Sequence, residues 1–353
     1  MHKTNFNIQG TIPRTQTFQL LVSSGIPMLD KLLGDGFPIG TVSLIEEDTY
    51  GTYARIVLKY FLAEGVVNEH AIFLASQEVD PKEIVAHLPA LIKEDCLDMK
   101  SSPADKMKIA FRYSNLPTNE PKVRHEFGHY FDLSSSMSRE TLEKVNVHCW
   151  PRENDLKSIS EPGYFKNPAY QDLLESIKAE IKNGGYLLSD TNPNGNILKI
   201  GIYGLGSPLW MSNCRKESIK DLRKFLYCLR ALLRSALAVA VVTIPMHLYN
   251  KFAANTYRNA SDICLRLQAL AGTELEHNKY LADYHGYFHI DKVAAINTFA
   301  SKCGGAVEYM FKLRRKKFTI EMLHLPPDLE VSESKNTTPT LGCASNSKHL
   351  LEF

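Results

Sequence analysis

The strongest constraint on the fold is the alternation of short apolar runs with segments of helical periodicity. Residues 41–45 (TVSLI) and 71–76 (AIFLAS) have the composition of buried strands. Between them, apolar side chains recur at helical spacing over residues 52–67. This order is typical of parallel sheets, in which a helix crosses over between two strands. The sequence therefore predicts an α/β fold with a mostly parallel central sheet flanked by helices.

A second group of elements follows later in the chain. A helix pattern at 170–182 ends at two glycines, and a strand is predicted at 197–203. The clearest helix pattern, 219–233, leads into ALAVAVVTIP (236–245), which is typical of a fully buried central strand. Three further strands are predicted, at 260–270, 285–290 and 317–325. The last two are expected to pair with each other at the edge of the sheet.

Composition limits the class of protein. The chain has 353 residues, of which 44% are hydrophobic, so it can form one large core or two modest ones. A formal net charge of +2 argues against general polyanion binding and leaves only local basic clusters. Seven cysteines occur without a CxxC pair, and we interpret them as reduced thiols of a cytoplasmic or nuclear protein rather than a disulfide framework or a zinc site.

No membrane role is expected from the sequence. The polar first residues lack the apolar run of a secretory signal. The longest apolar run, 236–245, is about half as long as a bilayer span requires.

Changes in composition suggest how the chain is organised. We expect a polar N-terminal segment at 1–20, a single α/β domain at 21–327 and a C-terminal tail at 328–353 that is rich in Ser, Thr and Asn. Within the domain, residues 93–168 are polar and carry several prolines. They are interpreted as a long insertion that is ordered only in part.

One segment identifies the type of α/β fold. Residues 24–47, SGIPMLDKLLGDGFPIGTVSLIEE, resemble the segment that opens RecA-like and KaiC-like ATPase domains. Gly34, Gly36 and Gly40 are expected to permit the backbone turns that lead into the first central strand. The resemblance implies a RecA-like fold with a phosphate-binding loop directly after residue 45.

The loop at that position, LIEEDTYGTYAR (44–55), has the wrong chemistry for phosphate. A working loop reads Gly, four residues, Gly-Lys-Ser/Thr, because backbone N–H groups wrap the phosphates, the lysine neutralises them and the hydroxyl holds magnesium. When Gly51 is aligned with the second glycine, Glu46 replaces the first glycine, Thr52 the lysine and Tyr53 the hydroxyl. The acids EED would also repel a polyphosphate.

The second ATPase motif is degenerate as well. The strand at 197–203 ends in Tyr203, where an acidic residue would be needed to position magnesium. Glu78 lies where such folds often keep a water-activating glutamate, but we interpret it as a solvated or interface carboxylate. The sequence therefore predicts degenerate Walker A and Walker B motifs, with Gly51, Thr52 and Tyr53 as the remnant of a nucleotide-binding loop. Neither a metal nor a cofactor is expected on the isolated chain.

Several features together resemble one family, the fourth subunit of the Elongator complex (PAXNEB family). They are the acidic, lysine-free loop, FGHYFDLS at 127–134, the mid-chain insertion, the leucine-rich helix before AVAVVTIP and the C-terminal GCASNSKHLLEF. The resemblance implies that the chain joins the fifth and sixth Elongator subunits in a heterohexameric RecA-like ring that binds tRNA and docks on the larger subunits. It implies an accessory, non-catalytic role in modification of the wobble uridine (U34), in the cytoplasm and nucleus. ATP is then possible only at composite interfaces between subunits.

Two other classes of protein remain open. The first is an active RecA-like or KaiC-like ATPase with unusual phosphate binding. The second is a zinc hydrolase, because HEFGH (125–129) matches HExxH, in which His125 and His129 would bind zinc and Glu126 would activate water. The residues after the motif look extended rather than helical. A buried anchor that pins the insertion to the domain is the competing interpretation.

Basic clusters supply the candidate tRNA contacts. The densest, RRKK, lies between two predicted strands, where a solvated hairpin tip is the alternative. Others lie in the loops after the two central strands, where Trp210, Tyr249 and Tyr257 could stack on unpaired bases or serve as packing residues. The candidate RNA-binding residues are Arg314, Arg315, Lys316, Lys317, Arg215, Lys216, Lys251 and Arg258.

Overall fold

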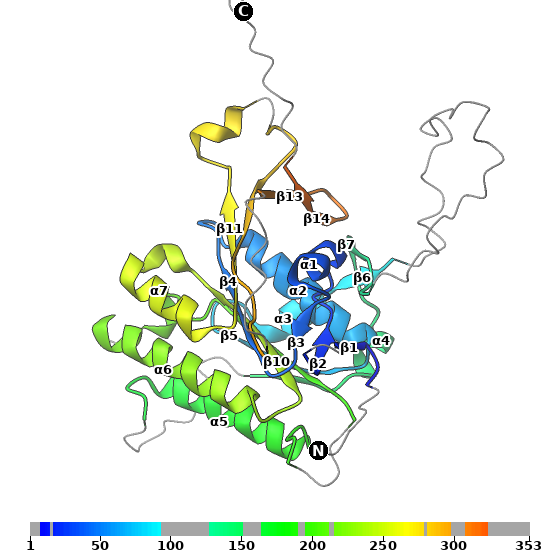
Figure 1. Cartoon of the computed structure of the whole chain (residues 1–353), viewed down its shortest axis with the longest axis vertical. Coiled ribbons are helices and arrows are strands. Elements are labelled where there is room, and N and C mark those ends of the chain that lie inside the picture. Colours follow the sequence, from blue (N-terminus) through cyan, green and yellow to red (C-terminus); the bar gives the residue numbers. More distant parts are fainter. Residues whose placement is uncertain are drawn as a thin grey trace, which may run out of the picture. The chain divides into compact units, whose positions relative to one another are not determined.

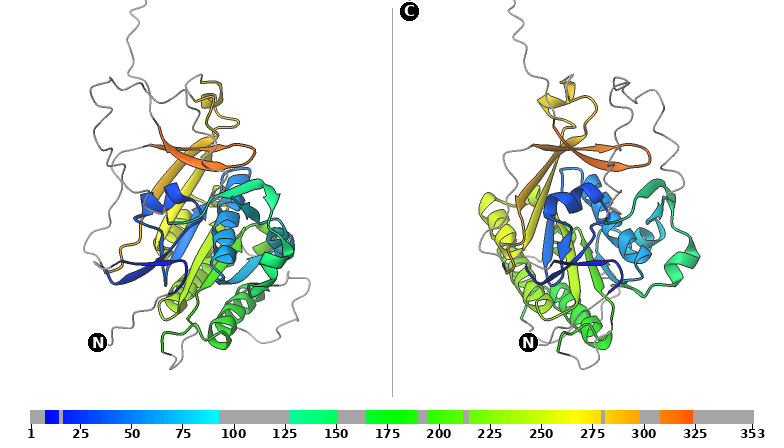
Figure 2. Two further views of the ribbon diagram at one scale, coloured as in Figure 1. Left: turned by 90° about the vertical axis from the view of Figure 1, so that its right-hand side faces the viewer. Right: turned by 45° about the vertical axis from the view of Figure 1, so that its right-hand side comes forward.

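A nine-stranded sheet organises the described part of the chain in the computed structural model (Figures 1 and 2). Its strands are β4 (Val42–Glu46), β5 (Ala71–Ser76), β8 (Val147–Cys149), β9 (Leu198–Tyr203), β10 (Ala238–Ile244), β11 (Ile263–Ala269), β12 (Gly286–Lys292), β13 (Tyr309–Leu313) and β14 (Phe318–Met322). Their order is β14-β13-β12-β11-β4-β10-β9-β5-β8. All strands from β11 to β8 in this order are parallel, which confirms the predicted mostly parallel sheet.

The structure describes residues 8–14, 17–92, 127–150, 164–189, 195–211, 215–278, 281–297 and 308–323. All of them belong to one unit, Met1–Leu323. The predicted tail at 328–353 lies outside the described residues, as do 93–126 and 151–163 of the predicted insertion.

Helices cover both faces of the sheet. They are α1 (Pro27–Leu33), α2 (Thr52–Val67), α3 (Pro81–Ala86), α4 (Arg139–Glu143), α5 (Pro168–Asn183), α6 (Arg215–Leu233) and α7 (Lys251–Ala260). α2 packs on one face against β5, β9 and β10, whereas α5, α6 and α7 lie together on the other (Figure 1). Among the described residues, none of the helices combines the length and apolar character that a bilayer crossing demands.

The central strand β10 explains why its sequence is apolar without interruption. Val239 and Val241 belong to the apolar core that includes α2, while Val242 and Ile244 belong to the core that includes α5 and α6. Neighbouring side chains of a strand point to opposite faces of the sheet. Because helices cover both faces, every residue of β10 is buried.

Capping side chains determine where several helices begin. The Asn167 side chain accepts a hydrogen bond from Ala169 N at 2.9 Å at the start of α5, and Asn250 accepts one from Ala253 N at 2.8 Å at the start of α7. Pro168 occupies the first turn of α5, where it needs no amide partner. The helices that were predicted at 170–182 and 219–233 are confirmed, with slightly earlier starts.

The glycine-rich approach to β4 adopts the predicted turns. Gly34, Gly36 and Gly40 have φ values of 83°, 118° and 79°, which L side chains rarely adopt. At Gly36 a Cβ atom would also lie 2.4 Å from Val22 O. Glycine is therefore required at this position for two independent reasons.

The antiparallel end of the sheet differs from the prediction. β12 pairs with β11 and β13, and β14 pairs with β13, so the expected pairing of 285–290 with 317–325 is wrong. The missing partner is β13, whose Lys312 interrupts its apolar pattern but bonds to Glu321 at 2.8 Å on β14. The strand predicted at 260–270 also begins later, at Ile263, because Ala260 ends α7.

Two smaller sheets flank the large one. The first contains β1 (Thr11–Arg14), β2 (Gln19–Val22) and β3 (Phe37–Pro38), and the second contains β6 (Pro89–Leu91) and β7 (Phe131–Ser136). The predicted insertion thus contributes β7, α4 and β8, and β8 is the last strand of the large sheet.

Candidate functional site

The loop after β4 lies at the point where the strand order of the parallel sheet reverses. β4 lies between β10 and β11; the chain leaves β4 into α2 on one face of the sheet and β10 into α7 on the other. In open α/β sheets, ligands bind outside the carboxyl ends of the strands at such a point. Residues 46–51 therefore hold the position at which a ligand would be expected.

Asp48 binds the backbone amides that a phosphate would otherwise use. Its carboxylate accepts hydrogen bonds from Tyr50 N at 3.1 Å and Tyr53 N at 3.3 Å. The first N–H groups of a helix lack partners within the helix and attract anions, and Gly51 itself has no side chain to cap α2. Asp48 is thus an internal anion at the N-terminus of α2. Burial raises the pKa of its carboxyl, although these hydrogen bonds oppose the shift.

Glu46 is paired with a cation from a distant part of the sequence. The Arg258 guanidinium on α7 bonds both oxygens of the Glu46 carboxylate, one of them at 2.7 Å. The Cys264 thiol on β11 donates to the same carboxylate at 3.3 Å. Planar arginine pairs with carboxylates are strong because two hydrogen bonds form in parallel. The charge of Glu46 is therefore neutralised within the chain.

Glu47 is buried beside two other acids. The hydroxyl of Thr243 donates to Glu47 Oε1 at 2.5 Å and accepts from Gly204 N at 2.8 Å. Burial, with smaller contributions from the charges of Glu78 and Asp48, raises the Glu47 pKa to about 7. Glu47 is only 7% exposed. The Glu47 carboxyl group is therefore protonated at acidic pH and loses its proton only around neutral pH.

The residues predicted as the remnant of the nucleotide loop have other contacts. Gly51 has a φ of 67° and its carbonyl accepts a hydrogen bond from the Tyr203 hydroxyl at 3.3 Å. Thr52 is exposed at the start of α2. The ring of Tyr53 packs on Phe311, with 4.6 Å between ring centroids, so its hydroxyl is not held in a magnesium-binding position by this loop.

The loop as a whole does not fit a polyphosphate. Glu46, Glu47 and Asp48 are all buried, and between them they engage the arginine, the hydroxyl and the amides of the site. A polyphosphate close to the Asp48 carboxylate would be repelled, most of all where water is excluded. The residues present therefore do not fit ATP in the isolated chain.

A group of potential metal ligands lies next to the same arginine. One ligand atom each from Glu46, Cys264 and Asp291 come within 4.8 Å of one another. However, Arg258 already bonds both oxygens of Glu46, and burial together with the Glu46 charge raises the pKa of the Cys264 thiol. A protonated thiol beside a guanidinium is a poor metal site.

Two of the predicted RNA-binding cations, Arg258 and Arg215, have hydrogen-bond partners within the chain. Besides Arg258, which binds Glu46, Arg215 donates from Nη2 to Leu248 O at 2.7 Å. Lys216 and Lys251 are exposed at the start of α6 and α7. Arg215 is exposed as well, so Arg215, Lys216 and Lys251 all lie at the surface where α6 and α7 begin.

The RRKK cluster forms the turn between β13 and β14, as the hairpin interpretation requires. Lys316 Nζ lies 3.8 Å from Asp132, and Lys317 lies over the ring of Tyr130 at 4.5 Å. Arg314 and Arg315 are exposed. Lys316 contacts β7 and Lys317 contacts the residue before it, but the Lys316 side chain stays 71% exposed. Arg314, Arg315 and Lys316 are therefore outward charges of the turn.

The aromatic residues of these loops are mostly core residues. Trp210 and Tyr257 are fully buried, and the Tyr249 hydroxyl bonds to Gly206 O. The suggestion that these rings stack on unpaired bases is therefore wrong for Trp210 and Tyr257. Phe252 in the first turn of α7 is 80% exposed. The sequence did not single it out, because no helix was predicted at 251–260.

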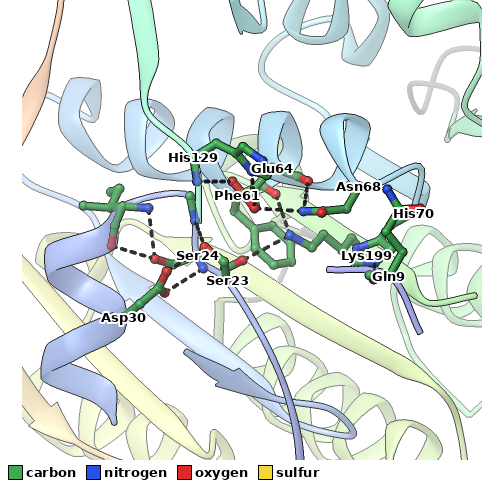
Figure 3. Close-up of polar contacts among 12 residues, drawn as sticks. Gln9, Ser23, Ser24, Asp30, Phe61, Glu64, Asn68, His70, His129 and Lys199 are labelled. Carbon is green, nitrogen blue, oxygen red and sulfur yellow. Dashed lines mark hydrogen bonds and ion pairs between the residues drawn. The ribbon is translucent and has the colours of Figure 1, made fainter. Parts of the chain in front are cut away.

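A buried charge network joins distant segments on the α2 face (Figure 3). Lys199 on β9 donates to Ser23 O at 3.1 Å and to Phe61 O at 3.2 Å. Glu64 on α2 accepts from Asn68 at 2.8 Å and from the backbone and ring of His129. The only sequence signal for this network is a single lysine within an apolar strand.

The environment of each group shifts its pKa. Burial lowers the pKa of Lys199 to about 8, although the Glu64 and Asp30 charges oppose the shift. Burial raises the pKa of Asp30 to about 6 against the hydrogen bonds of Ser23 and Ser24. Burial would raise the pKa of Glu64, but the His129 hydrogen bond and the Lys199 charge outweigh it and lower the pKa.

The end of the HEFGH motif belongs to this network. His129 Nδ1 lies 3.0 Å from Glu64 Oε1, and Phe131 is buried at the start of β7. The other motif residues, His125 and Glu126, lie outside the described residues. The described part of the motif is followed by a strand rather than forming a zinc-binding helix, so it has the structure of an anchor.

These features define a class of protein before any comparison. The chain is an open, mostly parallel α/β protein whose ligand-binding edge is filled by its own acids and their partners.

Comparison with known proteins identifies the family. The model of the family described as PAXNEB protein matches residues 4–353. Elongator complex protein 4 of Xenopus laevis is 40% identical, with 97% of this chain and 92% of that protein covered. The human protein of the same name is 40% identical over 98% and 85%, and that of Saccharomyces cerevisiae is 24% identical over 90% and 76%. The chain belongs to the PAXNEB family.

Proposed function

We propose that the chain is an accessory, non-catalytic subunit of the Elongator complex. The proposal rests on the match to proteins named Elongator complex protein 4 along nearly the whole chain. The proposal includes a RecA-like fold, which is supported by the parallel sheet and by the reversal of its strand order at the loop after β4. The subunit would act in the cytoplasm and nucleus.

The carboxylate of Asp48 at the N-terminus of α2 is the observation that carries the non-catalytic assignment. It bonds amides that an ATP phosphate would need, and Glu46 and Glu47 lie buried beside it. The loop thus keeps the backbone position of a phosphate loop but supplies its own anion. We therefore propose degenerate Walker A and B motifs, with ATP bound only where a neighbouring subunit contributes the missing cations.

The proposed role is assembly and tRNA binding. In this proposal, the chain joins the fifth and sixth Elongator subunits in a heterohexameric ring that supports modification of the wobble uridine (U34) by the larger subunits. Arg314 and Arg315 at the β13–β14 turn, with Lys216 and Lys251, supply outward positive charge for tRNA backbone contacts.

The experiment is co-expression with the fifth and sixth subunits, followed by mass measurement, tRNA titration and ATP titration of both the ring and the lone chain. We expect a hexamer that binds tRNA and a lone chain that binds no ATP with magnesium. Failure to assemble would contradict the proposal, and tight ATP binding by the lone chain would favour an active ATPase.

A further inference from the structure

In the part of the chain that the structure describes, the outer edge of the large sheet at β8 is not paired with a further strand. Among the described residues, β8 pairs only with β5. On the paired side, Ile72 N donates to Asn146 O and Trp150 N donates to Leu74 O, each at 2.9 Å. Because backbone groups alternate between the two sides of a strand, the N–H and C=O groups of Val147 and Cys149 face the outer side. An open edge of this kind is a template for another strand.

A cavity of about 670 Å³ opens beside this edge. Its apolar lining includes Val85 from α3, Met137 before α4 and Leu142 within α4 (the helices are labelled in Figure 1). Ligand pockets of proteins commonly fall in the range of roughly 300–1,000 Å³. The cavity is therefore large enough to hold side chains of a strand added next to β8.

Three basic side chains, and no carboxylate, are among the described residues that line the cavity. Lys82 lies on α3, Arg139 begins α4 and His148 belongs to β8, and all three are exposed. His148 stacks on Phe73 at 5.1 Å and lies 3.7 Å from Glu180, so its ring is held at the rim. Asp80 lies near but caps α3 by accepting from Lys82 N at 2.9 Å. The lining is thus complementary to negative charge.

We propose that this edge binds an extended acidic segment of another protein, which adds as a strand along β8. Peptides that extend a sheet gain affinity from main-chain hydrogen bonds and specificity from pockets for alternate side chains. Here the backbone groups of Val147 and Cys149 would bond the peptide, apolar side chains would enter the cavity, and carboxylates would meet Lys82 and Arg139. RNA fits less well because no Phe, Tyr or Trp is among the described residues that line the cavity.

Fluorescence anisotropy with the purified full chain tests the charge requirement. The probe is a labelled hexapeptide of alternating Glu and Val, and the matched probe carries Lys in place of Glu. We expect saturable binding of the acidic peptide that is about tenfold or more tighter than binding of the basic one, and about a tenfold loss in the variant Lys82→Glu/Arg139→Glu. The control Lys178→Glu, on the exposed side of α5, should bind like the wild type.

N-methylated probes test the strand itself and leave the protein unchanged. Methyl groups on alternate amides should abolish binding in one register and spare it in the other, because only one set of amides faces β8. Equal binding of both N-methylated peptides would overturn the added strand. Three results would overturn the acidic partner. The first is equal binding of the acidic and basic peptides, and the second is competition by inorganic phosphate or single-stranded RNA that is as strong as competition by the unlabelled acidic peptide. The third is tighter binding of the chain's own segment 326–335.

Discussion

The three consecutive acids after β4 show how one residue type can take three different roles. Glu46 balances Arg258, Glu47 retains its proton through burial, and Asp48 caps α2. Each role occupies something that a nucleotide would need. Glu46 engages a cation, Glu47 fills space beside the loop, and Asp48 engages backbone amides. In the proposed degenerate loop, specific interactions of the three acids would therefore fill the ligand position, in addition to the replacement of the lysine by Thr52.

The buried Glu47 carboxyl predicts a pH dependence of stability. Its pKa rises from 4.5 to about 7 on folding, so between these values the unfolded chain loses a proton that the folded chain keeps. Stability contributed by the protonated form is complete below pH 4.5 and is lost as the pH rises to 7. Glu47→Gln removes this loss. We expect the free energy of unfolding of Glu47→Gln minus that of the wild type to increase by about 2–3 kcal/mol between pH 4.5 and pH 7.

Urea unfolding at several pH values between 4.5 and 8 measures this difference. Glu175→Gln on the exposed side of α5 is the control, and it should show little change in its difference from wild type. A Glu47→Gln difference that is constant with pH would show that Glu47 ionises normally.

The buried Lys199 predicts a large cost when one member of its network is removed. Lys199→Met would leave Glu64 with its charge uncompensated by the lysine, and we expect a loss of about 3 kcal/mol in the free energy of unfolding. Adding Glu64→Gln should recover part of that loss, because the buried negative charge is then gone. Chemical denaturation of both variants and the double variant, with Lys178→Met as an exposed control, measures the coupling. Strictly additive effects of the two substitutions would disprove the coupling between Lys199 and Glu64.

Single residues could be predicted from the sequence only where the signal is local. Gly34, Gly36 and Gly40 were predicted to form turns, and all three have positive φ. The pairing of Glu46 with Arg258 joins residues 212 positions apart, and no spacing rule indicates it. The same holds for His129, whose partner Glu64 lies on a different element.

At the scale of elements, α2 depends on a cap that lies outside the helix. Asp48→Ala removes the acceptor for Tyr50 N and Tyr53 N, and we expect a loss of about 1 kcal/mol. Asp48→Asn keeps one oxygen acceptor and should retain most of the stability. Thermal unfolding compares the two variants, and faster amide exchange of Tyr53 in Asp48→Ala alone would localise the effect. Equal losses in both variants would indicate that charge rather than capping stabilises α2.

Strands with a mostly apolar sequence could be predicted, whereas strands that are very short or mixed in composition could not. β4, β5, β9 and β10 are buried on both faces, so their sequences are largely apolar, even though β9 contains Lys199. β13 was missed because Lys312 lies within it, and its ion pair with Glu321 exists only once β14 is in place. β8 was missed because three residues are too few to show a period.

At the scale of the whole molecule, the family match and the closed loop point to the same interpretation. In the proposed function, the chain keeps the parallel sheet and its reversal of strand order, and acids fill the ligand position, so the architecture would be kept without the chemistry. Selection on such a chain would then act on its surfaces. The candidate surfaces are the β13–β14 turn, the starts of α6 and α7, and the edge at β8.

The β13–β14 turn allows a test of the proposed tRNA surface in the proposed ring with the fifth and sixth subunits. Arg314→Glu/Arg315→Glu should weaken tRNA binding and reduce the slope of log affinity against log salt by about 1–2, because each lost phosphate contact removes roughly 0.7–0.9 from the slope. Lys316 and Lys317 are left intact because they hold the turn against Asp132 and Tyr130. Lys178→Glu is the matched charge reversal, and mass measurement confirms that each ring is complete. An unchanged slope in a fully assembled variant ring would remove this turn from the tRNA surface.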